Sequence, residues 1–399
     1  AKTDTSLREY ARRLRDWAAD TDGLDLVGVA HALVGRSTFP CRAVVLGRTV
    51  EEMREALTAL ADGVEHDNLT VGEARDGGRI GFIYPGQGSQ WPAMAHQLYR
   101  TSTVFRDSIN TTDATLRRHV DWSLLDVILE KPDAASLDRV DVVQPVLFAV
   151  TTALTALWRH HGINPDAVIG HSQGEITAAH ATGILALDQA ARLITHRGQA
   201  LTTIEGTGGM LAVTGPTPDE LPDLLTRLVP EHAASLHLAA HNAPTSSVLS
   251  GTPHAIQAAH QALTSHGLTA KIIPVSYASH CPHIDPLQAE LTKATVNPQS
   301  SDTTFYSSTR QQAVPGTELT IDYWWDNLRH PVHFHPTLQT LTTDGHHTLI
   351  EISPHPLLAP TIDNDTTVCH TLRRDTDPWH TLLTNTAHLH THTNHPITW

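Results

Sequence analysis

The feature that most constrains this chain is a Gly-x-Ser-x-Gly pentapeptide, Gly170–Gly174, placed between an apolar strand and a helix. Ala167–Ile169 has the composition of a short buried strand, and the alanine-rich segment from Glu175 onward favours a helix. A strand that turns so sharply into a helix needs glycines in the turn, and it exposes the serine side chain above the sheet. The pattern predicts one strand-turn-helix unit of a parallel sheet covered by helices.

The same alternation of strands and helices begins at Arg79, where Ile80–Tyr84 reads as a buried strand and Val146–Trp158 as an apolar helix. Between about residues 207 and 275 the order changes to β-α-β-β-α-β, which is typical of a ferredoxin-like unit. We therefore predict an α/β-hydrolase-like parallel-sheet subdomain with an inserted ferredoxin-like subdomain. The segments expected in the insert are Met210–Val213, Pro218–Leu228, Leu236–Ala240, Ser246–Ser250, Pro253–His266 and Ala270–Val275.

Residues 1–77 form a separate block with the pattern of a small α/β unit. A basic amphipathic helix is expected around Leu7–Ala19, a short strand at Cys41–Leu46 and a helix at Thr49–Ala61. Asp62–Gly78 is rich in glycine and charge, so it is expected to be a loop or linker. The pattern predicts a small α/β domain ahead of the larger one.

Residues 373–399 form a tail rich in histidine, threonine and asparagine. His388, His390 and His392 alternate along the chain, so they would share one face only on a strand. A metal site is conceivable there, but composition alone explains the histidines, and we expect none.

Composition excludes several classes of function. The chain has 399 residues and a formal net charge of −15, which opposes binding to a phosphate backbone, so no nucleic-acid partner is expected. The 3 cysteines are an odd, scattered set and read as free thiols of a reducing compartment. No apolar run approaches the roughly twenty residues of a membrane span, and the N-terminus has no signal-peptide pattern. We expect a cytoplasmic protein, with both chain ends reading as cuts in a longer polypeptide.

Ser172 is the candidate nucleophile, because the glycines push its hydroxyl out and the helix amides that follow can face an oxyanion. The alternative is a tight turn with no chemistry. A serine also needs a base, and 29 histidines are too many for spacing to choose between them. His280 is a candidate because it closes Tyr277–His280 at the end of a predicted strand, although most histidines in a chain like this serve packing or the surface.

Four blocks of the sequence resemble, in order and spacing, the acyltransferase domains of modular type I polyketide synthases. The resemblance spans Arg79–Leu372, which would make residues 78–372 the acyltransferase domain. It implies that residues 1–77 are the linker domain after a ketosynthase and that residues 373–399 are the post-acyltransferase linker. The threonine- and histidine-rich composition is also reminiscent of mycolactone-type synthases. The four blocks are Phe82–Trp91, Gly170–Glu175, Tyr277–His280 and Tyr323–Leu328.

The resemblance implies a Ser-His dyad. Ser172 would be the nucleophile and His280 the base, with no acidic third member. A backbone carbonyl at His355 would orient that histidine. The backbone amides of Gln87 and Gln173 would form the oxyanion hole.

The resemblance also implies a binding site for a carboxylated acyl group. Arg197 matches the family arginine that holds the free carboxylate, and a guanidinium can grip a carboxylate through two parallel hydrogen bonds. Read without the resemblance, Arg197 would be a surface charge on a helix. Gln144 and Asn242 match other positions of the family pocket.

Three places resemble the methylmalonyl type of the family: Arg139–Gln144, Gln173 and Tyr277–His280. Malonyl-specific relatives usually carry His-Ala-Phe-His at the last of these and a small aliphatic residue in place of Gln173. Ser279 in place of phenylalanine leaves space beside the α-carbon of the extender, where a methyl branch could sit. Tyr277 and Ser279 are both expected to bind the substrate.

The function implied is the transfer of an extender unit, methylmalonyl, from CoA to Ser172 and then to the phosphopantetheine thiol of an acyl carrier protein, in the biosynthesis of a polyketide antibiotic or toxin. The expected partners are that carrier protein and the adjacent ketosynthase of the same polypeptide. No metal or redox cofactor is expected. The alternatives are a malonyl-using acyltransferase and an α/β-hydrolase-type thioesterase, which the Ser172 motif alone would allow.

Overall fold

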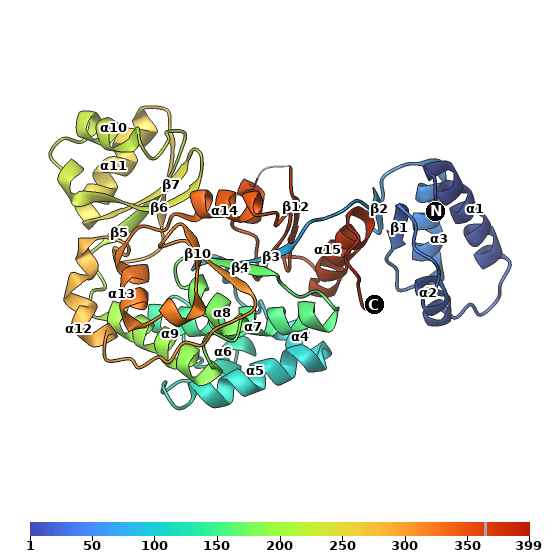
Figure 1. Ribbon diagram of the computed structural model, residues 1–399, viewed down its shortest axis with the longest axis horizontal. Helices are drawn as coiled ribbons and strands as arrows, with labels where there is room; N and C mark the ends of the chain where they lie inside the picture. Colours follow the sequence, from blue (N-terminus) through green and yellow to red (C-terminus); the bar gives the residue numbers. More distant parts are fainter. Residues whose placement is uncertain (363–364) are drawn as a thin grey trace.

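The computed structural model describes residues 1–362 and 365–399, which form three sheets of two, six and four strands. These sheets mark three units. The two-stranded sheet lies at one end of the longest axis, and the four-stranded sheet lies above the opposite end of the unit that holds the six-stranded sheet (Figure 1). We call the three units the N-terminal unit (residues 4–73), the large lobe (residues 80–202 and 282–370) and the ferredoxin-like lobe (residues 209–273). The chain leaves the large lobe, builds the ferredoxin-like lobe and returns, which is the insertion that the sequence predicted.

The six-stranded sheet is the centre of the large lobe. Its order is β10-β9-β4-β3-β11-β12, and every neighbouring pair is parallel except β10 with β9. Every residue of β3, β4 and β11 is buried, as expected for parallel strands covered on both faces. The strands are β3 (Ile80–Tyr84), β4 (Ala167–Gly170), β9 (Thr304–Ser307), β10 (Gln312–Val314), β11 (Thr348–Glu351) and β12 (Thr367–His370).

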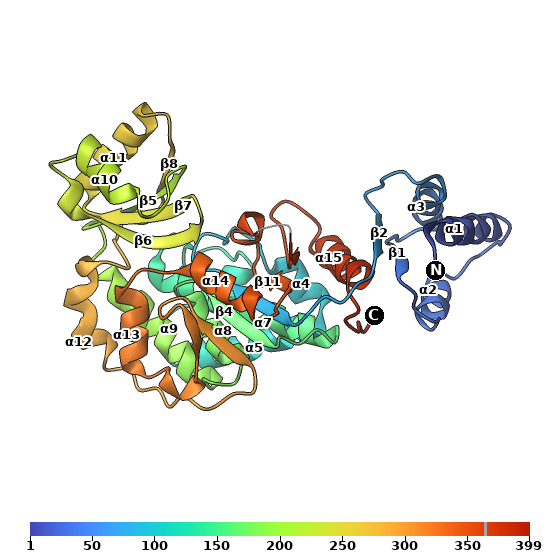
Figure 2. The ribbon, with the colours of Figure 1, turned by 45° about the horizontal axis from the view of Figure 1, so that its top comes forward.

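Alternate residues of these strands feed two different cores. Phe82 and Val168 belong to the core on the face that most helices cover, whereas Ile83 and Ile169 belong to the core beneath α14 (Figure 2). The helices of the large lobe are α4 (His96–Thr101), α5 (Thr103–Leu116), α6 (Leu124–Ile128), α7 (Val140–His160), α8 (Gly174–Ala181), α9 (Leu187–Thr202), α12 (Gln288–Leu291), α13 (Ile321–Arg329) and α14 (Phe334–Thr343).

Helix α7 lies between α5 and α9 in the larger of these cores. By length and composition alone it could cross a membrane, so the expectation that no such run exists was wrong; 83% of its most apolar window is buried inside the protein. The helix begins at Val140, six residues before the predicted start at Val146. Pro145 therefore lies within its first two turns and does not mark its start. Its apolar character fits burial on all sides.

The ferredoxin-like lobe has the predicted β-α-β-β-α-β order. Its four strands are arranged β6-β7-β5-β8, and all neighbouring strands are antiparallel. The sheet and the two helices of this lobe share a separate hydrophobic core. This arrangement confirms the predicted fold class. The elements are β5 (Gly209–Thr214), α10 (Leu221–Leu228), β6 (Leu236–Ala243), β7 (Ser246–Gly251), α11 (Pro253–Ser265) and β8 (Thr269–Ile273).

The N-terminal unit contains the two helices and the strand that were predicted, plus two elements that were not. Part of the supposed loop Asp62–Gly78 is a strand, β2, which pairs antiparallel with β1. Pairing with a partner 28 residues away decides this strand, because only two of its five residues are apolar. The elements are α1 (Asp4–Ala19), α2 (Leu26–Val34), β1 (Cys41–Val45), α3 (Val50–Asp62) and β2 (Leu69–Glu73).

The tail is a helix, α15 (Pro378–His392), and it packs on β1, β2 and β12 (Figure 1). The Asp377 side chain caps the first turn of this helix. The alternating histidines therefore lie on a helix and not on a strand. His388 and His392 stack one turn apart, with ring centroids separated by 4.0 Å, while His390 contacts Trp399. Among the described residues, no cluster of three or more His, Cys, Asp or Glu side chains could hold a metal ion.

Candidate active site

The turn at Gly170–Gly174 has the predicted geometry, with β4 ending at Gly170 and α8 beginning at Gly174. Neither glycine has room for a side chain: a Cβ on Gly170 would lie 2.3 Å from the Glu175 amide nitrogen, and one on Gly174 would lie 2.1 Å from the Tyr84 carbonyl oxygen. Ser172 adopts a φ of 54°, in the left-handed region that side chains rarely occupy. The two glycines thus let the chain turn tightly enough to hold Ser172 in this strained conformation.

Ser172 lies against His280. The Oγ atom of Ser172 is 2.8 Å from Nε2 of His280, and Nδ1 of His280 is 2.9 Å from the carbonyl oxygen of His330. A carbonyl only accepts, so Nδ1 carries the ring proton and Nε2 is left free to accept the serine proton. The two residues that the sequence proposed are in hydrogen-bond contact.

The carbonyl that orients His280 is not the predicted one. The carbonyl of His355 accepts a hydrogen bond from the Ser353 hydroxyl at 2.8 Å, and the His355 ring accepts from the Arg374 amide. His330, which directly follows α13, supplies the carbonyl instead. The prediction for His355 was therefore wrong. Sequence reasoning could not find His330, because a main-chain acceptor has no side-chain signature.

Burial sets the protonation of His280. Its side chain is 4% exposed, and burial, followed by the positive charge of Arg197 and the nearby ring of His171, lowers its pKa from 6.5 to about 3. The imidazole is therefore neutral at neutral pH.

Arg197 lies on α9 and is buried, which excludes the surface-charge reading. Its Nη2 donates to Ser172 Oγ at 2.9 Å, and its Nη1 donates to Oδ1 of Asn327 at 2.8 Å. Burial lowers the pKa of Arg197 from 12.5 to about 10, so the guanidinium stays charged at neutral pH. Its Nε has no hydrogen-bond partner in the part of the chain that the structure describes. A buried cation with an unused N–H thus lies beside the serine.

The Gly86–Gly88 turn lies next to the serine. A Cβ on Gly86 would be 3.2 Å from the His171 carbonyl oxygen and 3.7 Å from Cβ of Ser172. Gln87 follows in this turn and Gln173 is the N-cap residue of α8, and neither backbone amide donates a hydrogen bond to another described residue. Two amides therefore remain open near Ser172.

The hydroxyl of Tyr277 contacts one of the glutamines. It donates a hydrogen bond to Oε1 of Gln87 at 3.0 Å. Burial raises the pKa of Tyr277 to about 12, so the hydroxyl stays protonated.

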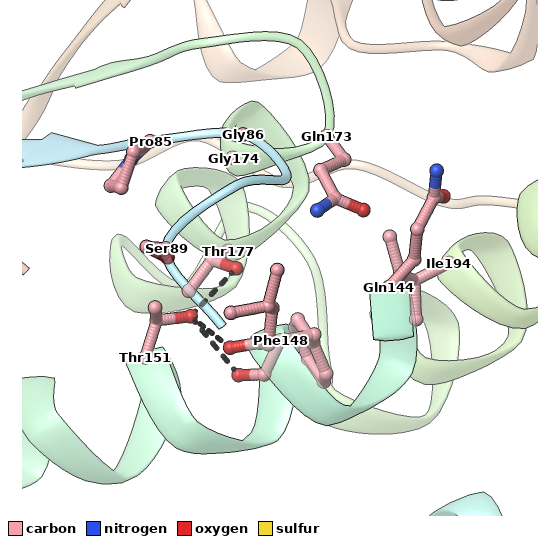
Figure 3. Close-up of a pocket in the computed structure, with 11 residues that line it drawn as sticks. Pro85, Gly86, Ser89, Gln144, Phe148, Thr151, Gln173, Gly174, Thr177 and Ile194 are labelled. Carbon is pink, nitrogen blue, oxygen red and sulfur yellow. Dashed lines mark hydrogen bonds between the residues drawn. The ribbon is translucent and has the colours of Figure 1, made fainter. Parts of the chain in front are cut away.

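Gln144 and Gln173 also line a small cavity between the serine turn and α7 (Figure 3). Its volume of about 10 Å³ is close to the minimum for one water molecule. The Oε1 atoms of both glutamines and the hydroxyl of Ser89 are buried without a partner among the described residues.

Two further predicted residues lie where the ferredoxin-like lobe meets the large lobe. Asn242 does not contact Ser172 or Arg197; its Oδ1 lies 2.8 Å from Nε2 of His171. Ser279 donates to the sulfur of Met210 at 3.4 Å. Both residues fix the lobes to each other at the edge of the site.

Sequence reasoning missed two residues of the site, Asn327 and Glu175. Asn327 contacts Arg197, the Ser172 carbonyl and Glu175, and the carboxylate of Glu175 is fully buried. Both residues stood inside motif blocks of the sequence. A polar residue on a strongly amphipathic helix such as α13 was the available signal.

The sequence matches the family model described as acyl transferase domain over residues 81–396. The chain belongs to the acyl transferase domain family. Residues 1–64 match a second model, described as RhiE-like, KS-MAT linker domain. The predicted resemblance to polyketide synthase acyltransferase domains is therefore confirmed.

Relatives of this acyl transferase domain are large polyketide synthases. The chain is 41% identical over 386 residues to the spectinabilin polyketide synthase system protein NorA' of Streptomyces orinoci, and 40% identical over 394 residues to the pikromycin polyketide synthase component PikAII of Streptomyces venezuelae. These matches cover 94% and 97% of the chain. The chain spans about 10% of the length of each relative.

A solved structure matches the whole fold. The acyltransferase domain from module 8 of the salinomycin polyketide synthase superposes with a TM-score of 0.93 at 37% identity, over 100% of this chain and 95% of that one. A malonyl CoA-acyl carrier protein transacylase from Clostridium perfringens, 22% identical, matches 77% of this chain and 96% of its own length with a TM-score of 0.66, which shows the shared fold alone.

Proposed function

We propose that this acyl transferase domain moves an extender unit, methylmalonyl in preference to malonyl, from CoA to Ser172 and then to the phosphopantetheine thiol of an acyl carrier protein. The observation that carries the proposal is the contact of Ser172 Oγ with both His280 Nε2, at 2.8 Å, and Arg197 Nη2, at 2.9 Å. A base and a carboxylate-binding group at one nucleophile suit a carboxylated acyl thioester.

In the first half-reaction, Ser172 attacks the thioester. His280 Nε2 takes the hydroxyl proton while Oγ bonds to the carbonyl carbon, and the amides of Gln87 and Gln173 stabilise the oxyanion. The tetrahedral intermediate collapses with loss of the CoA thiolate, which receives the proton from Nε2. The products are free CoA and an acyl ester on Ser172.

The second half-reaction reverses these roles. Nε2 takes the proton of the phosphopantetheine thiol, the thiolate attacks the ester, and the proton passes to the departing serine oxygen. No metal or redox group has a part in either step. The His330 carbonyl keeps Nδ1 protonated throughout, so Nε2 is always the atom that exchanges the proton.

Arg197 is proposed to hold the free carboxylate of the extender. Its charge is the second cause of the low pKa of His280, so a bound carboxylate would offset that charge and raise the basicity of the imidazole. The base would thus be strengthened when the correct substrate is present. An uncharged acyl group would lack this effect.

The preference for methylmalonyl rests on Ser279 and Gln173. Ser279 is 6% exposed, and its side chain occupies much less volume than the phenylalanine of malonyl-specific relatives would. A single methyl group changes discrimination by roughly 1 kcal/mol or slightly more, so exclusion of malonyl would be incomplete. A malonyl-using enzyme is the alternative. Ser279→Phe should shift the loading ratio toward malonyl by about tenfold, and an unchanged ratio in a competition assay would favour that alternative.

The partners belong to the proposal as well. A carrier protein would present the acceptor thiol, and a ketosynthase of the same polypeptide would adjoin the N-terminal unit, in keeping with the linker model matched by residues 1–64. The division into residues 1–77, 78–372 and 373–399 is part of the same proposal.

The deciding experiment is intact-mass analysis after incubation with methylmalonyl-CoA. The wild-type chain should gain one methylmalonyl group, and Ser172→Ala should gain none. Absence of an adduct on the wild type would overturn the proposal. Arg197→Ala should lower loading from methylmalonyl-CoA much more than loading from acetyl-CoA, since only the former offers a carboxylate.

A thioesterase of the α/β-hydrolase type is the second candidate, because it also uses a serine on a glycine-rich turn. The two differ in the lifetime of the acyl-serine. A transferase should keep the ester in water until carrier protein is added, whereas a hydrolase should lose it within a few turnovers.

A further inference from the structure

Glu175 is a buried carboxylate that the proposed mechanism does not use. It directly follows the serine turn and its side chain is 0% exposed. One oxygen accepts from the amide and hydroxyl of Ser308 at 2.6 and 2.7 Å, and the other from the Tyr323 hydroxyl at 2.5 Å and from Nδ2 of Asn327 at 2.8 Å. Burying a carboxylate is costly unless it is paired or well hydrogen-bonded. So complete a set of donors indicates that its position matters.

Asn327 connects this carboxylate to the site. Its Nδ2 donates to Glu175 and, at 3.2 Å, to the main-chain carbonyl of Ser172, while its Oδ1 accepts from Nη1 of Arg197. Arg197 can only donate, so Oδ1 must face it, and Nδ2 must then face Glu175. Every hydrogen-bonding atom of the Asn327 amide is therefore assigned, and Glu175 fixes which way the amide points.

The contact with Asn327 decides which edge of the guanidinium remains open. Nη1 of Arg197 is occupied by Asn327, whereas Nη2 points at Ser172 and Nε has no partner among the described residues. Nε and Nη2 carry parallel N–H bonds on one edge of the guanidinium, the arrangement that a carboxylate accepts with both oxygens. This edge lies beside the nucleophile.

We propose that Glu175 and Asn327 are positioning residues that turn the Nε–Nη2 edge of Arg197 toward Ser172, where the carboxylate of the acyl group would bind. Glu175 sets the orientation of the Asn327 amide, and the amide carbonyl holds Nη1 away from the substrate. This inference rests on the proposed function, since it gives Arg197 a carboxylate to bind. It adds a dependence of extender recognition on two residues that would not touch the extender.

Glu175 and Arg197 also influence each other electrostatically. Burial raises the pKa of the Glu175 carboxyl, and its hydrogen bonds from Tyr323, Ser308 and Asn327 oppose that shift. Burial lowers the pKa of the Arg197 guanidinium, and Glu175 is among the groups that oppose this. The same side chain also joins α8 to Ser308, which directly follows β9, and to α13, which would be a purely structural role. An experiment must therefore separate the effect of Glu175 on the orientation of Arg197 from its effect on the stability of the fold.

Glu175→Gln makes this separation. The new amide can still accept from Ser308, but it then presents an NH₂ group to Nδ2 of Asn327, so donor faces donor. Asn327 must turn its amide, which removes the acceptor from Nη1 of Arg197. We expect the KM for methylmalonyl-CoA to rise about 10- to 100-fold, with loading from acetyl-CoA changed less than about threefold.

Tyr323→Phe is the matched control. It removes one hydrogen bond to the same carboxylate oxygen but leaves the contact between Glu175 and Asn327 intact. Its thermal stability should fall about as far as that of Glu175→Gln, while its preference for methylmalonyl-CoA over acetyl-CoA should stay that of the wild type. If both variants lose the two activities in equal proportion, Glu175 is structural only and the inference is wrong.

Two further measurements keep the inference testable. If Glu175→Gln does not fold, Asn327→Ala should show the same selective rise in KM, and its absence would overturn the inference. In the Arg197→Ala background, Glu175→Gln should have no further effect on acetyl-CoA loading; an added loss would show a role independent of Arg197. A wild-type chain that is not acylated at all would instead overturn the proposed function.

Discussion

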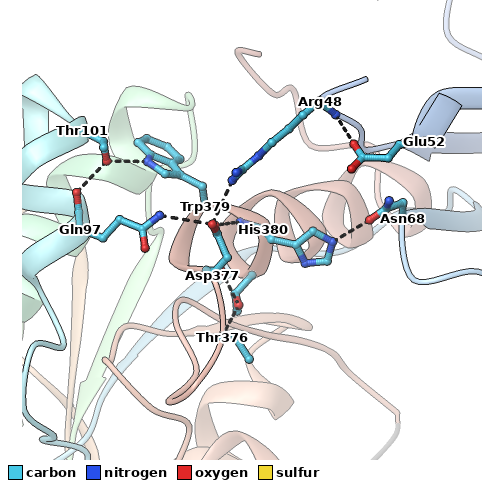
Figure 4. A network of polar contacts seen from close by, with 10 residues as sticks. Arg48, Glu52, Asn68, Gln97, Thr101, Thr376, Asp377, Trp379 and His380 are labelled. Atoms are coloured by element: carbon cyan, nitrogen blue, oxygen red, sulfur yellow. Dashed lines mark hydrogen bonds and ion pairs between the residues drawn. The ribbon is translucent and has the colours of Figure 1, made fainter. Parts of the chain in front are cut away.

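The molecule has two junctions between units, and they are built differently. The inner junction joins the ferredoxin-like lobe to the large lobe beside the active site, through the contact of His171 with Asn242, the contact of Ser279 with Met210 and a parallel bridge at Ala240. The outer junction joins the N-terminal unit to α4 and α15, with Asp377 at its centre (Figure 4).

The outer junction contains an exposed ion pair, beside the packing of α15 on β1 and β2. Asp377 accepts from Arg48 at 2.9 Å and from Gln97 at 3.2 Å, and the Arg48 side chain is 76% exposed. Exposed ion pairs contribute about 0–1 kcal/mol and weaken in salt. The inner junction uses uncharged groups, and Ser279 and Ala240 are buried within it. We therefore expect the position of the catalytic groups to depend on the inner junction, whereas the outer junction attaches the N-terminal unit.

The largest expected effect is at His280, whose loop crosses the inner junction. His280→Ala should lower the rate of Ser172 acylation by methylmalonyl-CoA about 10³-fold, because the base is lost. His330→Ala is the control, since it keeps the main-chain carbonyl that binds Nδ1 and should load within about twofold of wild type. Single-turnover acylation measures both. Equal losses in the two variants would contradict the assignment of the base.

A glycine at the inner junction gives the next largest effect. A Cβ on Gly208 would lie 2.4 Å from the Ala278 amide nitrogen, so Gly208→Ala should displace the segment that carries His280. We expect acylation to fall about 100-fold for a stability loss of about 1–3 kcal/mol.

Gly206→Ala is the matched control for this glycine. Gly206 has a φ of 79° and open space around it, so alanine should cost about 1 kcal/mol in stability without moving Ala278. It should therefore acylate at close to the wild-type rate. Parallel denaturation and acylation assays test the pair, and equal losses of acylation would remove the special role of the inner junction.

Acid should destabilise the fold through its buried histidines. His280, with a pKa of about 3 in the folded chain, stays neutral there but binds a proton when unfolded below about pH 6.5. The unfolded state then holds more protons than the folded state. The free energy of unfolding should therefore decrease as the pH is lowered, by about 1.4 kcal/mol per pH unit for this group between pH 6.5 and pH 3. Urea denaturation at pH 7.0 and 5.5 measures the slope, and His280→Ala should reduce it. An identical slope in the variant would contradict the buried neutral state.

The smallest effect is expected at the outer junction. Arg48→Ala should lower the free energy of unfolding by less than about 1 kcal/mol, and the difference should vanish in 1 M salt, because the lost ion pair is exposed. Acylation should be unchanged. A tenfold loss of acylation would show that the outer junction also positions the catalytic groups.

Much of the fold and of the site could be predicted where local pattern decides the structure. Gly170 and Gly174 fix the serine turn by steric necessity, and the order of strands in residues 207–275 was sufficient for the ferredoxin-like lobe. Ser172 and His280 were proposed from motif blocks and Arg197 from its match to a family position, and Ser172 contacts both of the other two.

The failures share a physical cause, which is dependence on a distant partner. Strand β2 exists because β1 pairs with it, and α15 is a helix although its histidines alternate. The acceptor for His280 is the main chain of His330, which no side-chain pattern reports. Asn327 and Glu175 were visible in the sequence, but only three-dimensional contact revealed that they meet Arg197.

The path of α15 has a consequence for exchanging this domain with that of a relative. The helix lies against β1, β2 and β12, and the guanidinium of Arg42 binds the carbonyls of His390 and Thr393 at 2.7 and 2.9 Å. Hydrogen bonds thus join residues some 350 positions apart, one in the N-terminal unit and the others at the end of α15. A graft that exchanged the central segment alone would set a foreign β12 against a native helix. Splice points placed outside both flanks would carry the interlocked surfaces together.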